Sequence, residues 1–220
     1  MKITFTQFKK AFTLAEVLIT LVIIGVVATL TIPTAVSNYR KQEYVSRLKK
    51  TYSALAQVSS QIIAEQGSPI NWVTSNDSVY KLYKSKLVNV KDCDAGSGCF
   101  EQKFARLNGS DFSDDWNTID GKKLILSDGT QLMIGGSSAY SISPTCSLTV
   151  LGETKNVCIA FYVDVNGNKN PNRWGRDLFA FVLTPDGFYP SGYEKVTECS
   201  SSMNGWDCAG KVLRENAMHY

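Results

Sequence analysis

Six cysteines, all located after residue 92, are the side chains with the most obvious capacity for chemistry. An even number of cysteines in an exported chain favours disulfides over reactive thiols. Zinc is disfavoured because the sequence has no CxxC pair and its single histidine is the penultimate residue, His219. Many pairings are formally open, but the spacing favours three local loops. The predicted pairs are Cys93–Cys99, Cys146–Cys158 and Cys199–Cys208.

A second group of potential ligands lies in the loop DVNGNKNPNRWGRD, which runs from Asp164 to Asp177. Its alternating carboxylate and amide oxygens suit Ca²⁺, and the candidate ligands are Asp164, Asn166 and Asp177. The spacing is not that of an EF-hand, since Gly167 occupies the fourth position and no glutamate closes the loop. The alternative is a hairpin loop whose Asn and Asp side chains cap their own backbone. Three basic residues oppose the two carboxylates, which favours capping and leaves calcium as the alternative; no cofactor is required.

Nothing in the sequence indicates catalysis or nucleic-acid binding. A lone terminal histidine disfavours His-based triads, and Gly135-Gly136-Ser137 lacks the lysine of a phosphate-binding loop. The chain has 23 basic and 20 acidic residues, and no surplus of positive charge is clustered along it. We therefore expect a non-enzymatic protein whose partners are not nucleic acids.

The run from Phe12 to Ile32 is apolar and contains one charged residue, Glu16. As a helix it is long enough to span the ~30 Å hydrocarbon layer of a membrane. Lys9 and Lys10 precede it, so the part of the chain after the run is predicted to be exported. A cleaved secretory signal is disfavoured because no small-x-small site follows and helical periodicity continues without a break. A membrane carboxylate is costly, so Glu16 is predicted to have a partner.

Residues 9–33, KKAFTLAEVLITLVIIGVVATLTIP, resemble the N-terminal signal of type IV prepilins and type II secretion pseudopilins. The resemblance rests on the register of a basic pair, a small residue, Phe-Thr-Leu, a lone glutamate and a distant proline. It implies cleavage by prepilin peptidase between Ala11 and Phe12, followed by N-methylation of Phe12. Glu16 then becomes the fifth residue of the mature chain and Pro33 the twenty-second. Ala11 replaces the glycine that is usual before the cut, and it keeps the small side chain that cleavage requires.

In that family, the glutamate of an incoming subunit pairs with the amino terminus of a neighbour, so Glu16 and Pro33 are the predicted assembly residues. The resemblance implies a structural subunit of a type IV pilus-like filament. Its partners are copies of itself, the prepilin peptidase and an inner-membrane assembly platform. Before assembly a single helix holds it in the bacterial inner membrane with its head exported; afterwards the filament is extracellular or periplasmic. The alternatives are a type II secretion pseudopilin and a non-polymerising, membrane-anchored binding module.

The rest of the sequence predicts the scaffold behind these sites. Apolar residues at spacings of three and four, from Val45 to Ile62, predict an amphipathic helix that Gly67-Ser68-Pro69 ends. A short helix is expected around 77–87, and another short helix or a loose end after the last cysteine loop. Asp128-Gly129 predicts a hairpin. The predicted strands are 122–127, 130–136, 156–165 and 177–184, with a further turn before 188–190.

The predicted fold class is α+β and pilin-like. A long N-terminal helix, part membrane anchor and part amphipathic, packs on a C-terminal antiparallel sheet of about four strands. The expected domains are a leader peptide (1–11), a transmembrane and assembly helix (12–33), the amphipathic half of the helix (34–66) and a globular head (67–220).

Overall fold

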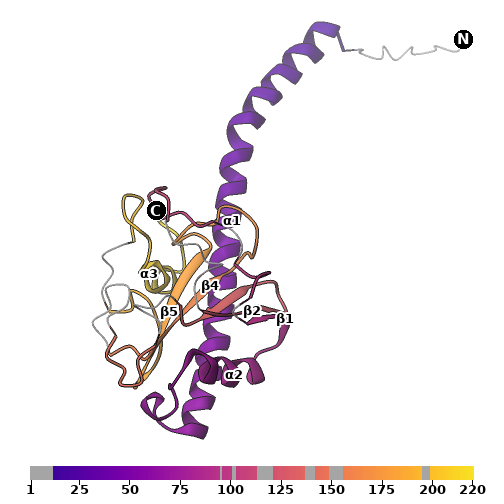
Figure 1. Cartoon of the computed structure of the whole chain (residues 1–220). Coiled ribbons are helices and arrows are strands. Elements are labelled where there is room, and N and C mark those ends of the chain that lie inside the picture. Colours follow the sequence, from indigo (N-terminus) through magenta and orange to yellow (C-terminus); the bar gives the residue numbers. More distant parts are fainter. Residues whose placement is uncertain are drawn as a thin grey trace, which may run out of the picture. The chain divides into compact units, whose positions relative to one another are not determined.

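The computed structural model describes residues 12–94, 96–100, 103–112, 121–136, 142–148, 156–194 and 199–220. Residues 9–11 of the predicted processing signal lie outside these ranges. The chain divides into two compact units, residues 1–40 and 41–220. Helix α1 (Leu14–Gln66) contributes its first part to one unit and its second part to the other (Figure 1). The boundaries of the four predicted domains remain predictions.

In the first unit, α1 leaves its side chains uncovered. Residues 12–40 are exposed apart from Ala28, which is half-buried. Within the described residues, α1 is the helix that is long and apolar enough to cross a membrane. Hydroxyl groups along it donate at 2.8–2.9 Å to backbone carbonyls three or four residues earlier; they belong to Thr20, Thr29 and Thr31. The helix therefore satisfies these hydroxyls internally, as an apolar solvent requires.

In the second unit, the remainder of α1 is amphipathic, as predicted. Its buried face is mainly apolar and repeats at helical spacing through Tyr44, Val45, Leu48, Thr51, Leu55, Val58, Ser59 and Ile62. The helix ends before Gly67, whose φ of +81° favours glycine and whose N–H donates to the Ile63 carbonyl at 2.9 Å. A 3₁₀ turn, η1 (Pro69–Asn71), follows. The stop signal read from the sequence is confirmed.

The sheet of the head has six antiparallel strands, in the order β1-β2-β3-β4-β5-β6. The strands are β1 (Asn89–Asp94), β2 (Lys122–Leu126), β3 (Gln131–Ile134), β4 (Ile159–Asp164), β5 (Leu178–Thr184) and β6 (Gly187–Pro190). The four predicted strands correspond to β2 through β5, and the Asp128-Gly129 hairpin joins β2 to β3. The expectation of about four strands was too low, because it omitted the two edge strands, β1 and β6.

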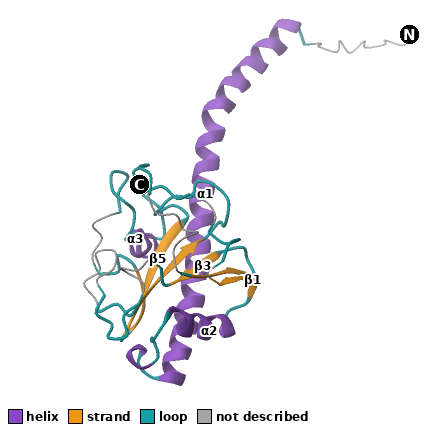
Figure 2. Ribbon diagram, viewed as in Figure 1, coloured by secondary structure: helices purple, strands orange, loops and turns teal. Residues whose placement is uncertain are grey.

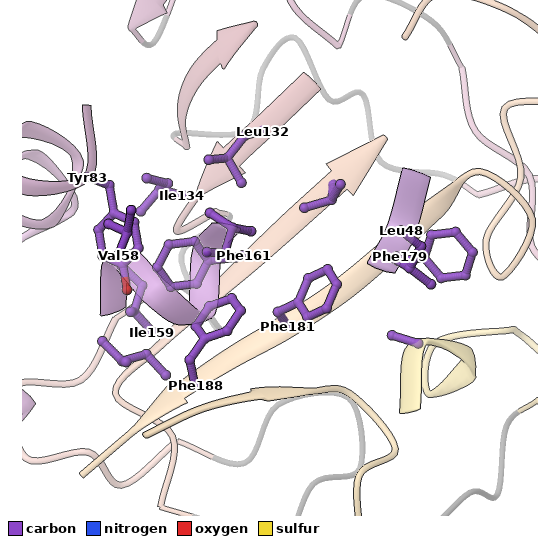
Figure 3. Close-up of a cluster of buried hydrophobic side chains, with 14 of the residues drawn as sticks. Leu48, Val58, Tyr83, Leu132, Ile134, Ile159, Phe161, Phe179, Phe181 and Phe188 are labelled. Atoms are coloured by element: carbon purple, nitrogen blue, oxygen red, sulfur yellow. The ribbon is translucent and has the colours of Figure 1, made fainter. Parts of the chain in front are cut away.

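The core lies between this sheet and the second part of α1 (Figures 2 and 3). Phe161 of β4 contacts Tyr83 with ring centroids 4.8 Å apart, and Tyr52 of α1 stacks on Phe181 of β5 at 5.7 Å. Leu48, also on α1, is completely buried. A smaller cluster, which includes Met133, Ala160 and Trp174, covers the opposite face of the sheet. Both faces of the central strands are therefore buried, which explains their continuous apolar sequences.

Two short helices complete the head. Helix α2 (Asn76–Lys86) confirms the helix predicted around 77–87, and it begins with a reciprocal capping box between Ser75 and Ser78. Helix α3 (Cys208–Glu215) follows the last cysteine loop. Of the two predicted alternatives, a short helix or a loose end, the structure therefore shows the helix. The α+β, pilin-like layout of the prediction is confirmed: a long N-terminal helix followed by an antiparallel sheet.

Candidate assembly site

Glu16 lies in the first turn of α1, where its carboxylate closes a capping box with Thr13. Its Oε2 accepts the Thr13 backbone N–H at 2.8 Å and the Thr13 hydroxyl at 2.7 Å. In return, the Thr13 Oγ1 accepts the backbone N–H of Glu16 at 3.2 Å. Free N–H groups and the positive end of the helix dipole both favour a carboxylate here. The pattern Thr-x-x-Glu is a known signature of this cap, so the sequence held the signal for Thr13, although it was not interpreted.

The predicted processing residues flank this cap. Phe12 directly precedes Thr13 and is 85% exposed, while Ala11 lies outside the described residues. The amino group that cleavage would create belongs to Phe12, the residue directly before Thr13, whose N–H Glu16 accepts. The two charges expected to pair between subunits therefore belong to one turn of each chain.

Pro33 is accommodated within α1 without ending the helix. Proline has no N–H, so it cannot donate to the carbonyl of Thr29, four residues earlier. The exposed apolar surface passes through this point, with Leu30 72% and Ile32 58% exposed. Its predicted role in assembly remains a prediction.

The loop between β4 and β5 brings the three candidate calcium ligands together. Asp164 Oδ1 accepts the Asn166 backbone N–H at 3.1 Å, and Asp177 Oδ2 accepts the Asn166 side-chain amide at 3.0 Å. Asp177 also accepts the backbone N–H of Asn172 at 2.7 Å and that of Arg173 at 2.6 Å. Burial raises the pKa of the Asp177 carboxyl, and these N–H donors oppose that rise.

This hydrogen bonding fits the capping alternative better than it fits a metal. The lone pairs of Asp177 point at N–H donors, which would repel a cation. No cluster of three or more His, Cys, Asp or Glu that could hold a metal occurs in the described part of the chain. Two amide oxygens of the loop, Asn166 Oδ1 and Asn172 Oδ1, are nevertheless buried without a hydrogen-bond partner among described residues. Calcium binding therefore remains the untested alternative.

Side chains of α1 within the head fix this loop in place. The Asn166 amide donates to Tyr44 Oη at 3.1 Å, and Tyr44 Oη donates to the Asn170 carbonyl at 3.4 Å. Arg47 Nη1 donates to the Val165 carbonyl at 3.3 Å. No local pattern in the sequence indicates these contacts, because they join α1 to a loop that lies more than 100 residues later in the chain.

The six cysteines form the three local disulfides that their spacing favours. Cys93–Cys99 closes a loop from β1, Cys146–Cys158 precedes β4, and Cys199–Cys208 joins its loop to the first residue of α3. No cysteine remains free. The disulfides therefore belong to the architecture of the head and leave no thiol for other chemistry.

Two family models match different parts of the chain, one before Pro33 and one after it. Residues 7–32 match the prokaryotic N-terminal methylation motif. Residues 34–220 match a family of unknown function (DUF6613). The chain belongs to this family. No curated protein and no solved structure matches it.

The methylation motif decides the broad class of this family member. It is the signal of type IV pilins and pseudopilins, and it coincides with the register of Phe12, Glu16 and the apolar helix. The chain is therefore a type IV pilin-like or pseudopilin protein with a membrane-anchoring N-terminal helix. The signal points to a structural role for the protein.

Proposed function

We propose that this protein is a structural subunit of a type IV pilus-like filament that polymerises through residues 12–40. The observation that supports this most directly is the uncovered apolar surface of α1 within those residues. Phe12 and Leu14 are 85% and 80% exposed, and Val22 and Ile24 are 65% and 63% exposed. Such a surface requires lipid or other apolar helices around it. A filament core supplies those helices after the subunit leaves the membrane.

Processing prepares the assembly contact. The peptidase removes residues 1–11 and exposes the amino group of Phe12, which is then methylated. In an apolar bundle of helices an unpaired carboxylate is strongly disfavoured, so Glu16 needs a cation as well as its own cap. The amino terminus of a neighbouring Phe12 is the cation that the proposed assembly supplies. Because the attraction depends steeply on distance at low dielectric, this pair fixes the stagger between subunits.

The head remains outside the membrane throughout. Lys9 and Lys10 keep the leader on the cytoplasmic side, and the disulfides of the head suit an oxidising compartment. We infer a single-pass protein of the bacterial inner membrane that engages the prepilin peptidase and an assembly platform. It later resides in an extracellular or periplasmic filament made of copies of itself, with or without related subunits.

Mass spectrometry of the protein purified from its native cells, combined with electron microscopy of sheared filaments, tests this proposal. We expect an N-terminal peptide that begins with methylated Phe12, and filaments in which this protein is present. The variant Phe12→Ser should show whether the apolar residue after the cut is needed, with Thr34→Ser as a matched control. An intact Met1, or a processed chain absent from any filament, would instead indicate a non-polymerising anchored module.

A further inference from the structure

The two edges of the head's sheet carry different exposed apolar residues. At the β1 edge, Val88 is 75% exposed and Val90 is 68% exposed, the highest values for large hydrophobic residues in the part of the head that the structure describes. Lys91, Asp92 and two irregularities in pairing with β2 protect the remainder of this edge from strand addition. The exposed valines are therefore available to a side-chain contact rather than to an extended ladder.

A groove of about 300 Å³ lies beside Val88, and we call it the β1 groove. Its walls come from α1, from the segment between α2 and β1, and from the β2–β3 turn; they include Thr51, Ala54, Val58, Leu87, Val88 and Leu126. The Thr51 hydroxyl is buried and has no hydrogen-bond partner among the described residues. The groove thus combines apolar side chains such as Val58, Leu87 and Val88 with polar ones such as Gln57 and Gln61.

The charge on the β1 groove is positive in balance. Lys50 and Lys86 line it together with one carboxylate, Asp128. Lys50 pairs with Asp128 at 2.8 Å, and Lys86 pairs with Glu65, outside the lining, at 2.6 Å. The Lys50 side chain is still 67% exposed. A partner that brings aromatic side chains and a carboxylate would match this lining.

The opposite edge of the same sheet has those properties. Tyr189 of β6 and Tyr193 just after it have ring centroids 5.0 Å apart, and Tyr193 is 50% exposed. Tyr52 lies close enough to both that their phenol groups raise its pKa, after burial as the main cause. Asp186 in the β5–β6 turn is exposed and joins no ion pair within the described part of the chain. We call Tyr52, Tyr189, Tyr193 and Asp186 the β6 patch.

We propose that the β6 patch of one subunit docks on the β1 groove of a second copy of this chain. The two surfaces occupy opposite edges of one sheet, so the contact is heterologous and leaves a free groove and a free patch on every pair. Such a contact extends into an open array, whereas a β1-to-β1 contact would close as a dimer. The proposal rests on the proposed filament and adds a head-to-head contact to it. Tyrosine at the centre and charge at the rim are typical of such interfaces.

Photocrosslinking in cells that express the full-length protein tests this contact. A benzoylphenylalanine side chain is placed at position 88, at the rim of the β1 groove. A matched probe replaces Ile70, which is 48% exposed and does not line the groove. We expect crosslinked dimers in filaments from the position-88 probe, joined to peptides that contain residues 186–194. The position-70 probe should not give that product.

Two substitutions provide an independent measurement. Tyr193→Ala and Val88→Glu should each lower filament yield about tenfold or more, while N-terminal processing and the melting temperature of the head stay unchanged. Their combination should be no worse than the stronger single change, because both remove the same contact. Filaments with normal yield in both variants, or position-88 crosslinks that map only to other segments, would overturn the docking proposal and leave the filament proposal intact. Failure of the wild-type chain to enter filaments would overturn both.

Discussion

The two regions of the chain differ in how far their apolar side chains are buried: residues 12–40 expose them, whereas residues 41–220 bury most of them. Almost every side chain of the first region is exposed, although most are apolar. The second region buries most of its large apolar side chains, many of them between α1 and the sheet, and three disulfides hold its loops. The first region is thus incomplete as a water-soluble structure, while the second is complete.

The two regions also differ in what their residues are expected to determine: processing and assembly in the first region, and folding stability in the head. The exposed region carries the residues proposed to act in processing and assembly, and residues 7–32 match the prokaryotic N-terminal methylation motif. The head matches a family of its own, and its named contacts explain stability rather than an activity. Substitutions in the first region should therefore change polymerisation without changing folding of the head, and core substitutions in the head should do the reverse.

The largest expected effect is that of Glu16→Gln. Glutamine retains the shape and the ability to accept a hydrogen bond from Thr13, but it loses the charge that is proposed to pair with a neighbour's amino terminus. We expect filament yield to fall below detection while export and folding of the head are unchanged. Quantitative immunoblots of sheared filaments and of the membrane fraction measure both quantities.

Glu43→Gln is the matched control, since Glu43 lies on the same helix and pairs locally with Arg47 at 3.0 Å. A surface pair of this kind is worth little, so filaments of this variant should be normal. Normal filament yield from Glu16→Gln would remove the central distinction between the two regions.

The second-largest expected effect is the loss of stability when a core side chain of the head is truncated. Phe161 is completely buried and contacts the rings of Tyr83 and Phe188. Phe161→Ala should lower the free energy of unfolding by about 3–5 kcal/mol. Ile23→Ala, at a position 57% exposed in the first region, should leave it unchanged. Urea unfolding of the full chain in detergent, followed by tryptophan fluorescence, distinguishes them; equal losses would show that the regions do not fold independently.

The sequence predicted the elements of this fold well where a pattern is local. Heptad-like spacing gave α1, turn residues gave the β2–β3 hairpin, and cysteine spacing gave the three disulfides. Continuous apolar runs gave β4 and β5, because both of their faces are buried. The edge strand β1 was missed because its sequence, NVKDCD, has one buried residue, Cys93, and therefore no alternating apolar pattern. Strand β6 is short and ends at Pro190, and neither feature indicates a strand in the sequence alone.

Contacts between distant residues explain most of what remained hidden. The approach of Tyr44 to Asn166 joins positions far apart in the sequence, and no local pattern encodes it. The hydrogen bonds of Asp177 are equally hidden in the sequence. The sequence shows that a carboxylate is present, but it does not show whether N–H donors or a cation contact its oxygens. By contrast, the Thr13–Glu16 cap is local and could have been predicted.

A smaller effect is expected at Asp177. Its carboxylate accepts N–H groups of Asn166, Asn172 and Arg173 within a buried loop. Asp177→Asn replaces one accepting oxygen with a donor, so at least one N–H loses its partner. The free energy of unfolding should fall by about 1–3 kcal/mol. Asp186→Asn, an exposed control, should change it by less than about 0.5 kcal/mol. A negligible loss at Asp177 would mean that the loop does not depend on this capping.

The dependence of head stability on pH is a still smaller effect. Hydrogen bonds from Lys84 and Tyr80 lower the pKa of Asp92 below its ordinary value of 3.8. A lowered pKa in the folded state adds stability above pH 3.8, and this contribution is lost as pH falls through the folded-state pKa. The wild type should therefore lose stability on acidification faster than Asp92→Asn. Parallel urea midpoints for both proteins between pH 5 and pH 2 would contradict this coupling.

Calcium should have the smallest effect on the head. Asp177 already directs its lone pairs at N–H donors, and the buried Asn166 and Asn172 oxygens add no charge to attract a cation. We therefore expect no heat of binding and no change in melting temperature at millimolar calcium. A rise in melting temperature that Asp164→Asn abolishes would reverse this conclusion. In that case the head would also depend on a binding partner, a cation, for its full stability, and it would differ less from residues 12–40, which need lipid or other helices around them.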